Sequence, residues 1–116
     1  MELTIQERML LISVLPQRGN MMLAEAVHCL ASKLRPSADD LAAAGHELIY
    51  GPGGEIVGER LAKDEPHEIE LSQAEIELLA RSLRDADKAD QLPIAPGSVD
   101  AVLSAWAKIM GAKDGR

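Results

Sequence analysis

The sequence predicts an α+β fold: three N-terminal helices, a small antiparallel sheet made of a hairpin plus a third strand, and two C-terminal helices. The 116 residues are 47% hydrophobic but include no Phe, one Tyr and one Trp, so the core is aliphatic, which favours helices. Apolar residues recur at helical spacing near both ends of the chain, and the period changes to that of strands between them. This length suits one domain, which we place at residues 1–111, followed by a frayed tail, 112–116.

The first helix is expected to run from Ile5 to about Leu15. Thr4 and Glu7 have the spacing of a capping box, in which each side chain accepts a hydrogen bond from a free backbone N–H of the other residue. Pro16 ends the helix. Its apolar residues cover more than one face, which indicates either a central buried helix or a helix that contacts another chain.

The next two helices are predicted from their caps. Asn20 is expected to cap a helix from Met21 to about Leu34, and Ser37 a short helix that ends at Gly45. The first turn of the short helix is acidic, as the helix dipole favours. One inward stripe is predicted on the longer helix, made of Leu23, Ala26, Val27, Leu30 and Leu34.

The middle of the chain has the pattern of strands. Residues 46–60 are predicted to form a hairpin, with Pro52 and Gly53 at the central positions of a type II turn. The segment "HEIEL", residues 67–71, alternates apolar and acidic side chains and is expected to add a third strand to the sheet.

Two further helices are expected after the strands. Ser72 and Glu75 form a second capping box for a helix over 73 to about 88, and Ser98 is expected to cap a helix over 99–110 that ends at Gly111. The residues predicted to face inward are Ile76, Leu79, Ala80 and Leu83 on the first, and Val102, Leu103, Trp106, Ile109 and Met110 on the second.

Charge and cysteine content limit the classes of function. The net charge is −7, and residues 36–70 contain nine acidic and two basic residues. An acidic surface repels the phosphate backbone, so we do not expect nucleic acid as a partner. The single Cys29 excludes an internal disulfide and suits a reducing compartment. With no secretion signal or membrane span recognisable in the sequence, we expect a soluble cytoplasmic protein.

No catalytic, cofactor-binding or metal-binding set is predicted. His28 and Cys29 are adjacent on a helix and point about 100° apart, while His46 and His67 have no second ligand at short spacing. No nucleophile elbow, P-loop or dinucleotide-binding glycine pattern occurs. We therefore expect a protein that is not an enzyme and has no cofactor.

Three helices followed by a hairpin is also the element order of a winged helix. The third helix, however, reads "SADDLAAAG" and offers carboxylates where a DNA-reading helix presents basic or amide side chains. A transcriptional regulator remains one alternative, with Arg8, Arg18, Lys33 and Arg35 as its nearest basic residues. A second alternative is an acidic inhibitor that imitates nucleic acid and blocks a host defence protein.

Two stretches carry a resemblance to a known group. "LTIQERMLLISVLP" followed by "GN", within residues 3–20, and "EIELSQAEIELL", residues 68–79, resemble small proteins of tailed bacteriophages and prophages, most of which have no assigned function. The resemblance implies a phage protein in the cytoplasm of a bacterial host cell. It supplies no catalytic residue.

We therefore predict a non-enzymatic protein–protein interaction module of phage type, acting in virion assembly or on a host factor. Its partner is another protein or a second copy of the chain. The candidate contact surfaces are the acidic segment, residues 36–70, and the apolar first helix, and three methionines are added to the candidate contact residues. The candidate partner-binding residues are Asp39, Asp40, Glu55, Glu59, Asp64, Glu65, Glu68, Glu70, Met9, Met21 and Met22.

Overall fold

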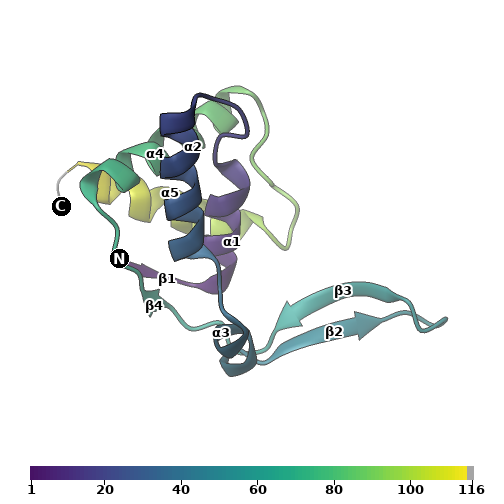
Figure 1. Ribbon diagram of the computed structural model, residues 1–116. Coiled ribbons are helices and arrows are strands. Elements are labelled where there is room, and N and C mark those ends of the chain that lie inside the picture. Colours follow the sequence, from purple (N-terminus) through teal and green to yellow (C-terminus); the bar gives the residue numbers. More distant parts are fainter. Residues whose placement is uncertain (115–116) are drawn as a thin grey trace.

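The computed structural model, which describes residues 1–114, consists of a helical body from which one β-hairpin projects (Figure 1). The predicted α+β class is confirmed. The helices are α1 (Ile5–Val14), α2 (Met21–Leu34), α3 (Ala38–Ala43), α4 (Gln73–Lys88) and α5 (Val99–Lys113). The strands are β1 (Glu2–Leu3), β2 (His46–Tyr50), β3 (Ile56–Leu61) and β4 (His67–Glu68).

Helix α1 lies at the centre of the body. It contacts α2, α4 and α5, and its Leu10 and Leu11 are buried in the core, as is Leu15 just after its end. Its apolar surplus is therefore explained by burial against several helices of the same chain. Met9 is the exception, because half of its surface is exposed. The rest of the core includes Leu3, Leu30, Leu34, Leu79, Leu83, Val102 and Ile109.

Side-chain caps fix where most of the helices begin. Thr4, Ser37 and Ser72 each form a capping box, and the side chain of Asn20 accepts a hydrogen bond from the Leu23 amide. Each satisfies an amide that has no partner within its helix. Ser98 differs, since α5 begins after it but its hydroxyl makes no capping hydrogen bond.

The predicted end of the last helix is wrong. Helix α5 continues through Gly111 to Lys113, so residues 112 and 113 are helical and are not part of a frayed tail. A glycine inside a helix costs only about 0.5–1 kcal/mol relative to alanine, and burial of Ile109 one turn earlier holds the helix against the body. Residues 115 and 116 of the predicted tail lie outside the described residues.

The predicted single sheet is also wrong, because the strands form two separate antiparallel pairs. Strand β2 pairs with β3, whereas β4 pairs with β1, matching Leu3 with His67. The cause lies at the start of the chain, where the buried side chain of Leu3 holds a two-residue strand against the body. So short a strand has no periodicity for a pattern to detect.

The hairpin turn lies where it was predicted but is of another type. The Gly54 amide donates a hydrogen bond to the Gly51 carbonyl at 3.0 Å, with Pro52 and Gly53 between them. A type II turn needs a positive φ at Gly53, but within the described backbone the positive φ of this turn, 83°, belongs to Gly54. The left-handed residue therefore comes one position later than predicted.

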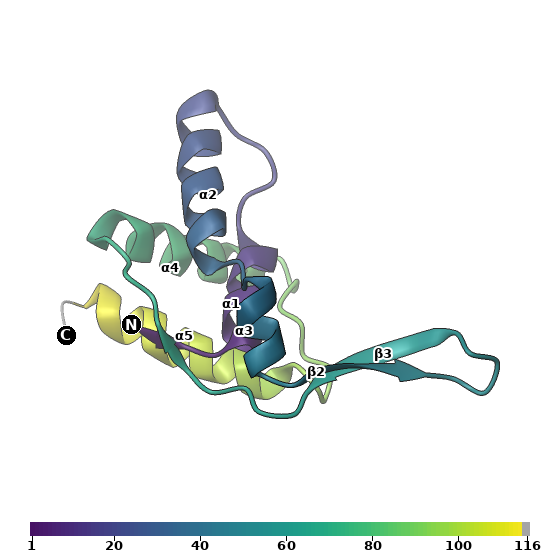
Figure 2. The same ribbon diagram turned by 60° about the horizontal axis from the view of Figure 1, so that its bottom comes forward.

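Two residues predicted to face inward are exposed. Ala26 lies on the half of α2 that extends away from the body, while Leu30 and Leu34 in the other half are buried (Figure 2). Leu103 lies on the outer side of α5, next to the buried Val102. Within residues 1–114, no helix combines the length and the apolar character needed to cross a bilayer.

Candidate functional site

The hairpin formed by β2, β3 and their turn, residues 46–61, projects from the body as an arm (Figures 1 and 2). The radius of gyration is 15.1 Å, above the value of about 13 Å expected for a compact chain of this length. Besides the pairing of its own strands, the arm's main contact is that of β2 with α3. Most of its surface therefore faces solvent.

Large apolar side chains are exposed along this arm. Tyr50, Ile56 and Val57 are each 61% exposed, and Leu48 and Ile49 are each more than 40% exposed. A two-stranded sheet with no layer packed against it is marginally stable in water. An exposed apolar patch of this kind is typical of an interaction site.

The acidic and basic residues in the two strands of the arm are paired across the strands. Arg60 lies opposite Glu47 and forms an ion pair with it at 2.6 Å, and His46 Nε2 lies 2.7 Å from a carboxylate oxygen of Glu59. These exposed pairs contribute little to stability. The Glu47–Arg60 pair does neutralise part of the arm's charge, so that the apolar side chains dominate its outer half.

An open groove of about 510 Å³ lies at the base of the arm. It is bounded by α1, α3, the first residues of β2, the last residues of β3, and the segment that leads into α5. Its lining is mainly apolar and comprises Ile5, Gln6, Met9, Leu10, Ser13, Leu41, His46, Glu59, Arg60, Leu61, Pro93, Gly97, Ser98 and Ala101. The groove is a concave, mainly apolar surface, and the arm is a projecting one. His46 and residues 59–61, at the base of the arm, belong to both.

The structure does not gather the predicted acidic residues on one face, and three of them have partners in the helical body. Asp64 accepts hydrogen bonds from the amides of Ile5 and Gln6 at the start of α1, at 2.7 and 3.1 Å. Glu68 binds the amino group of Met1 at 2.6 Å. Asp40 is bonded within its capping box and lies 3.4 Å from Arg8. Hydrogen bonds with Ser37 lower the pKa of Asp40, and the bond from the Ser37 backbone amide has the largest effect.

The other predicted acidic residues lie at the surface in different places. Glu55 and Glu59 belong to the arm, Asp39 is on α3, and Glu65 lies in the loop after β3, 3.7 Å from Lys63. Glu70 is exposed between β4 and α4. Of this acidic set, only the two arm residues lie on the exposed apolar hairpin.

The predicted methionines are separated as well. Met9 lines the groove, whereas Met21 and Met22 begin α2, at 75% and 81% exposure. Figure 2 shows this end of α2 far from the arm. Met9 therefore belongs to the arm and groove, and the other two methionines form a different exposed spot.

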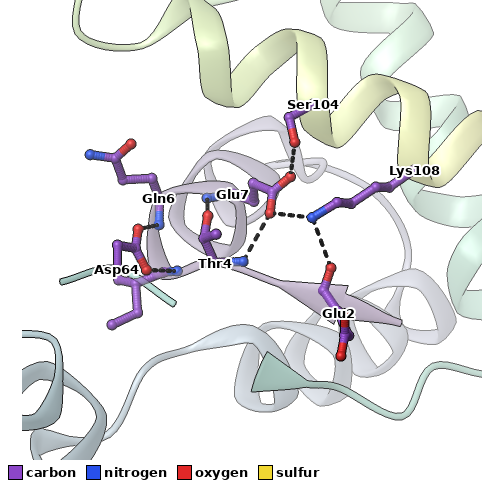
Figure 3. A network of polar contacts seen from close by, with 8 residues as sticks. Glu2, Thr4, Gln6, Glu7, Asp64, Ser104 and Lys108 are labelled. Atoms are coloured by element: carbon purple, nitrogen blue, oxygen red, sulfur yellow. Dashed lines mark hydrogen bonds and ion pairs between the residues drawn. The ribbon is translucent and has the colours of Figure 1, made fainter. Parts of the chain in front are cut away.

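Among the polar and charged residues that the structure describes, Glu7 is the most buried, at 2% exposure (Figure 3). It accepts hydrogen bonds from the Thr4 amide at 2.9 Å, from Lys108 Nζ at 2.8 Å and from the Ser104 hydroxyl. Burial raises the pKa of Glu7, but the hydrogen bonds from Lys108, Ser104 and Thr4 outweigh burial and lower it. Lys108 also donates to the Glu2 carbonyl at 3.0 Å, so this cluster joins α1, α5 and β1.

A second buried charge, Arg8, joins α1 to the end of α2. Its guanidinium donates to the carbonyls of Leu34 and Arg35 at 2.8 and 3.2 Å. These carbonyls lie at the negative end of the helix dipole and have no partner within the helix. The predicted basic face included Arg8, and the role predicted for Glu7 was limited to capping. The signal in the sequence for these buried charges was the adjacent pair Glu7 and Arg8 within a largely apolar helix.

The exposed apolar residues of the arm were missed in the same way. Their signal was the apolar triplet "LIY" in β2 and the pair "IV" in β3, which place apolar side chains on both faces of the hairpin. The helical body can pack against only one face of a hairpin, so apolar side chains on the other face stay exposed.

Metal-ligating residues do not cluster in the part of the chain that the structure describes: no three His, Cys, Asp or Glu side chains lie close enough to hold an ion. Comparison with protein families, with curated proteins and with solved structures finds no match for this chain. The phage resemblance therefore stays a prediction.

Proposed function

We propose that this protein is a non-enzymatic protein–protein interaction module that binds its partner through the arm and the groove at its base. The observation that carries the proposal is the exposure of Tyr50, Ile56 and Val57 on a hairpin that packs mainly on itself. Aromatic and large aliphatic side chains of this kind dominate the centres of protein interfaces. The proposed setting is that of a small phage accessory protein, in virion assembly or acting on a host factor.

The charge of the arm favours a protein partner over DNA. Between residues 46 and 61 the chain carries Glu47, Glu55 and Glu59 against a single Arg60. A wing that follows a DNA backbone would need the opposite balance, because each phosphate contact requires a cation. The regulator therefore ranks below a protein-binding arm. The nucleic-acid mimic ranks below it for another reason, because the acidic residues are not gathered on one face and several of them are bound within the chain.

Site-specific photo-crosslinking in bacterial cells tests this function. A photoreactive phenylalanine derivative replaces Tyr50 in one variant and, as a matched control, the exposed Glu77 of α4 in another. We expect a discrete covalent adduct at position 50 that position 77 does not give. Equal labelling at both positions, or no protein adduct at position 50, would contradict the proposal.

A further inference from the structure

We propose that the arm binds a second copy of this chain, with the tip of each arm inserted into the groove at the base of the other. The inference rests on the proposed function, because it names the partner of the same surface. It commits to a two-fold symmetric dimer, in which each chain contributes one tip and one groove.

The shape of the molecule favours this arrangement. The apolar tip, represented by Tyr50 and Val57, and the apolar groove lie at opposite ends of one arm. A two-fold axis through the middle of the arm lays two arms side by side in opposite directions, which brings each tip to the partner's groove. A two-fold interface needs such a self-complementary surface. Strands of this length span about 17–20 Å, so the arms would contact along their whole length.

Chemistry at the two ends is complementary. The groove offers Ile5, Met9 and Leu41 to an apolar tip. Glu55, beside the turn, forms no ion pair within residues 1–114. The base of the arm carries Arg60 at the groove, where its guanidinium already pairs with Glu47 but has further N–H donors for a second carboxylate. In the two-fold arrangement the tip carboxylate of each chain approaches Arg60 of the other.

The size of the surface fits a stable dimer. The arm spans residues 46–61, and the groove adds ten lining residues from outside the arm. Because a partner arm covers one face of the hairpin, these residues are an upper limit, and this limit lies within the roughly 20–30 residues a side of a standard interface. Neither the arm nor the groove reaches this size alone.

Salt dependence separates a second copy from a basic partner. Each chain has a net charge of −7, so two copies repel at long range. Salt screens this repulsion, and dimer formation should strengthen between about 0.01 M and about 1 M salt, as the Debye length falls from about 30 to about 3 Å. Binding to a basic protein would weaken over the same range.

The first experiment is analytical ultracentrifugation of the full chain over a range of concentrations. We expect a monomer–dimer equilibrium that the Tyr50→Ser/Val57→Ser variant weakens by at least about tenfold. The matched control, Met21→Ser/Met22→Ser, removes two still more exposed apolar residues from α2 and should leave the dimer unchanged. A wild-type chain that stays monomeric throughout overturns the inference.

The second experiment tests the arrangement itself, in a Cys29→Ser background. Val57→Cys chains are mixed with Gln6→Cys chains, and in parallel with Ala24→Cys chains, whose new thiol lies on the exposed part of α2. Tip-to-groove insertion predicts a mixed disulfide dimer with Gln6→Cys in large excess over that with Ala24→Cys. Equal yields overturn tip-to-groove docking. A monomeric chain that still gives a heterologous adduct at position 50 would overturn the dimer but retain the proposed function.

Discussion

The helical body and the arm contain similar aliphatic residues, but the body buries them and the arm exposes them. In the body, Leu11 and Leu30 are fully buried, and among the described side chains no buried nitrogen or oxygen lacks a hydrogen-bond partner. On the arm, Tyr50 and its apolar neighbours face solvent. The body therefore accounts for the stability of the fold, whereas the arm's apolar residues are available for binding.

The largest effect is expected from shortening a core side chain. Leu11→Ala removes buried methyl groups from the centre of α1 and should lower the free energy of unfolding by about 2–5 kcal/mol. Ile56→Ala on the arm should change it by less than about 0.5 kcal/mol. Urea denaturation followed by circular dichroism measures both. Similar losses for the two variants would abolish the distinction between body and arm.

A smaller loss is expected from Glu7→Gln. The amide keeps the size of the side chain but loses the charge that holds Lys108 and cannot accept all three hydrogen bonds. The free energy of unfolding should fall by about 1–3 kcal/mol. Glu77→Gln on the exposed face of α4 is the matched control, and a loss no larger than the control's would refute the role given to Glu7.

The same carboxylate predicts how stability depends on pH. The pKa of Glu7 in the folded protein is lowered from its ordinary value of 4.5. A group of this kind stabilises the fold fully above the unfolded pKa and loses that contribution as pH falls through the folded pKa. The pKa values of Asp40 and Glu75 are lowered too and act in the same direction.

Urea midpoints measured from pH 7 down to pH 3 test this dependence. The wild-type midpoint should hold above about pH 5 and fall in more acidic solution. Glu7→Gln should start lower at pH 7 and lose less on acidification. Parallel curves for the two proteins would show that Glu7 is not among the groups responsible.

The smallest effect on global stability is expected in the turn of the arm. Gly54→Ala places a side chain at φ 83°, which should cost about 1 kcal/mol locally. Hydrogen exchange of the arm amides should accelerate, while the unfolding midpoint of the body stays constant. Gly111→Ala, at a helical glycine with open space around it, should not accelerate that exchange.

Much of the fold could be predicted because its signals are local. Thr4 with Glu7, Asn20, and Ser72 with Glu75 lie within three residues of the amides that they cap, so the starts of α1, α2 and α4 follow from the sequence. The hairpin was likewise fixed by Pro52 and its neighbouring glycines. Of the candidate site, the sequence predicted Glu55, Glu59 and Met9 as contact residues. It did not predict the exposed apolar surface that joins them.

By itself, then, the sequence determined the α+β class, the starts of its main helices and the place of the hairpin turn, since these depend on neighbouring residues. Only the tertiary structure decided that β4 pairs with β1 and that Glu7 binds Lys108, 101 positions away. The tertiary structure alone also decided that the arm projects from the body. Whether an apolar strand is covered depends on what the rest of the chain packs against it, and here the body closes around α1 and leaves the hairpin outside.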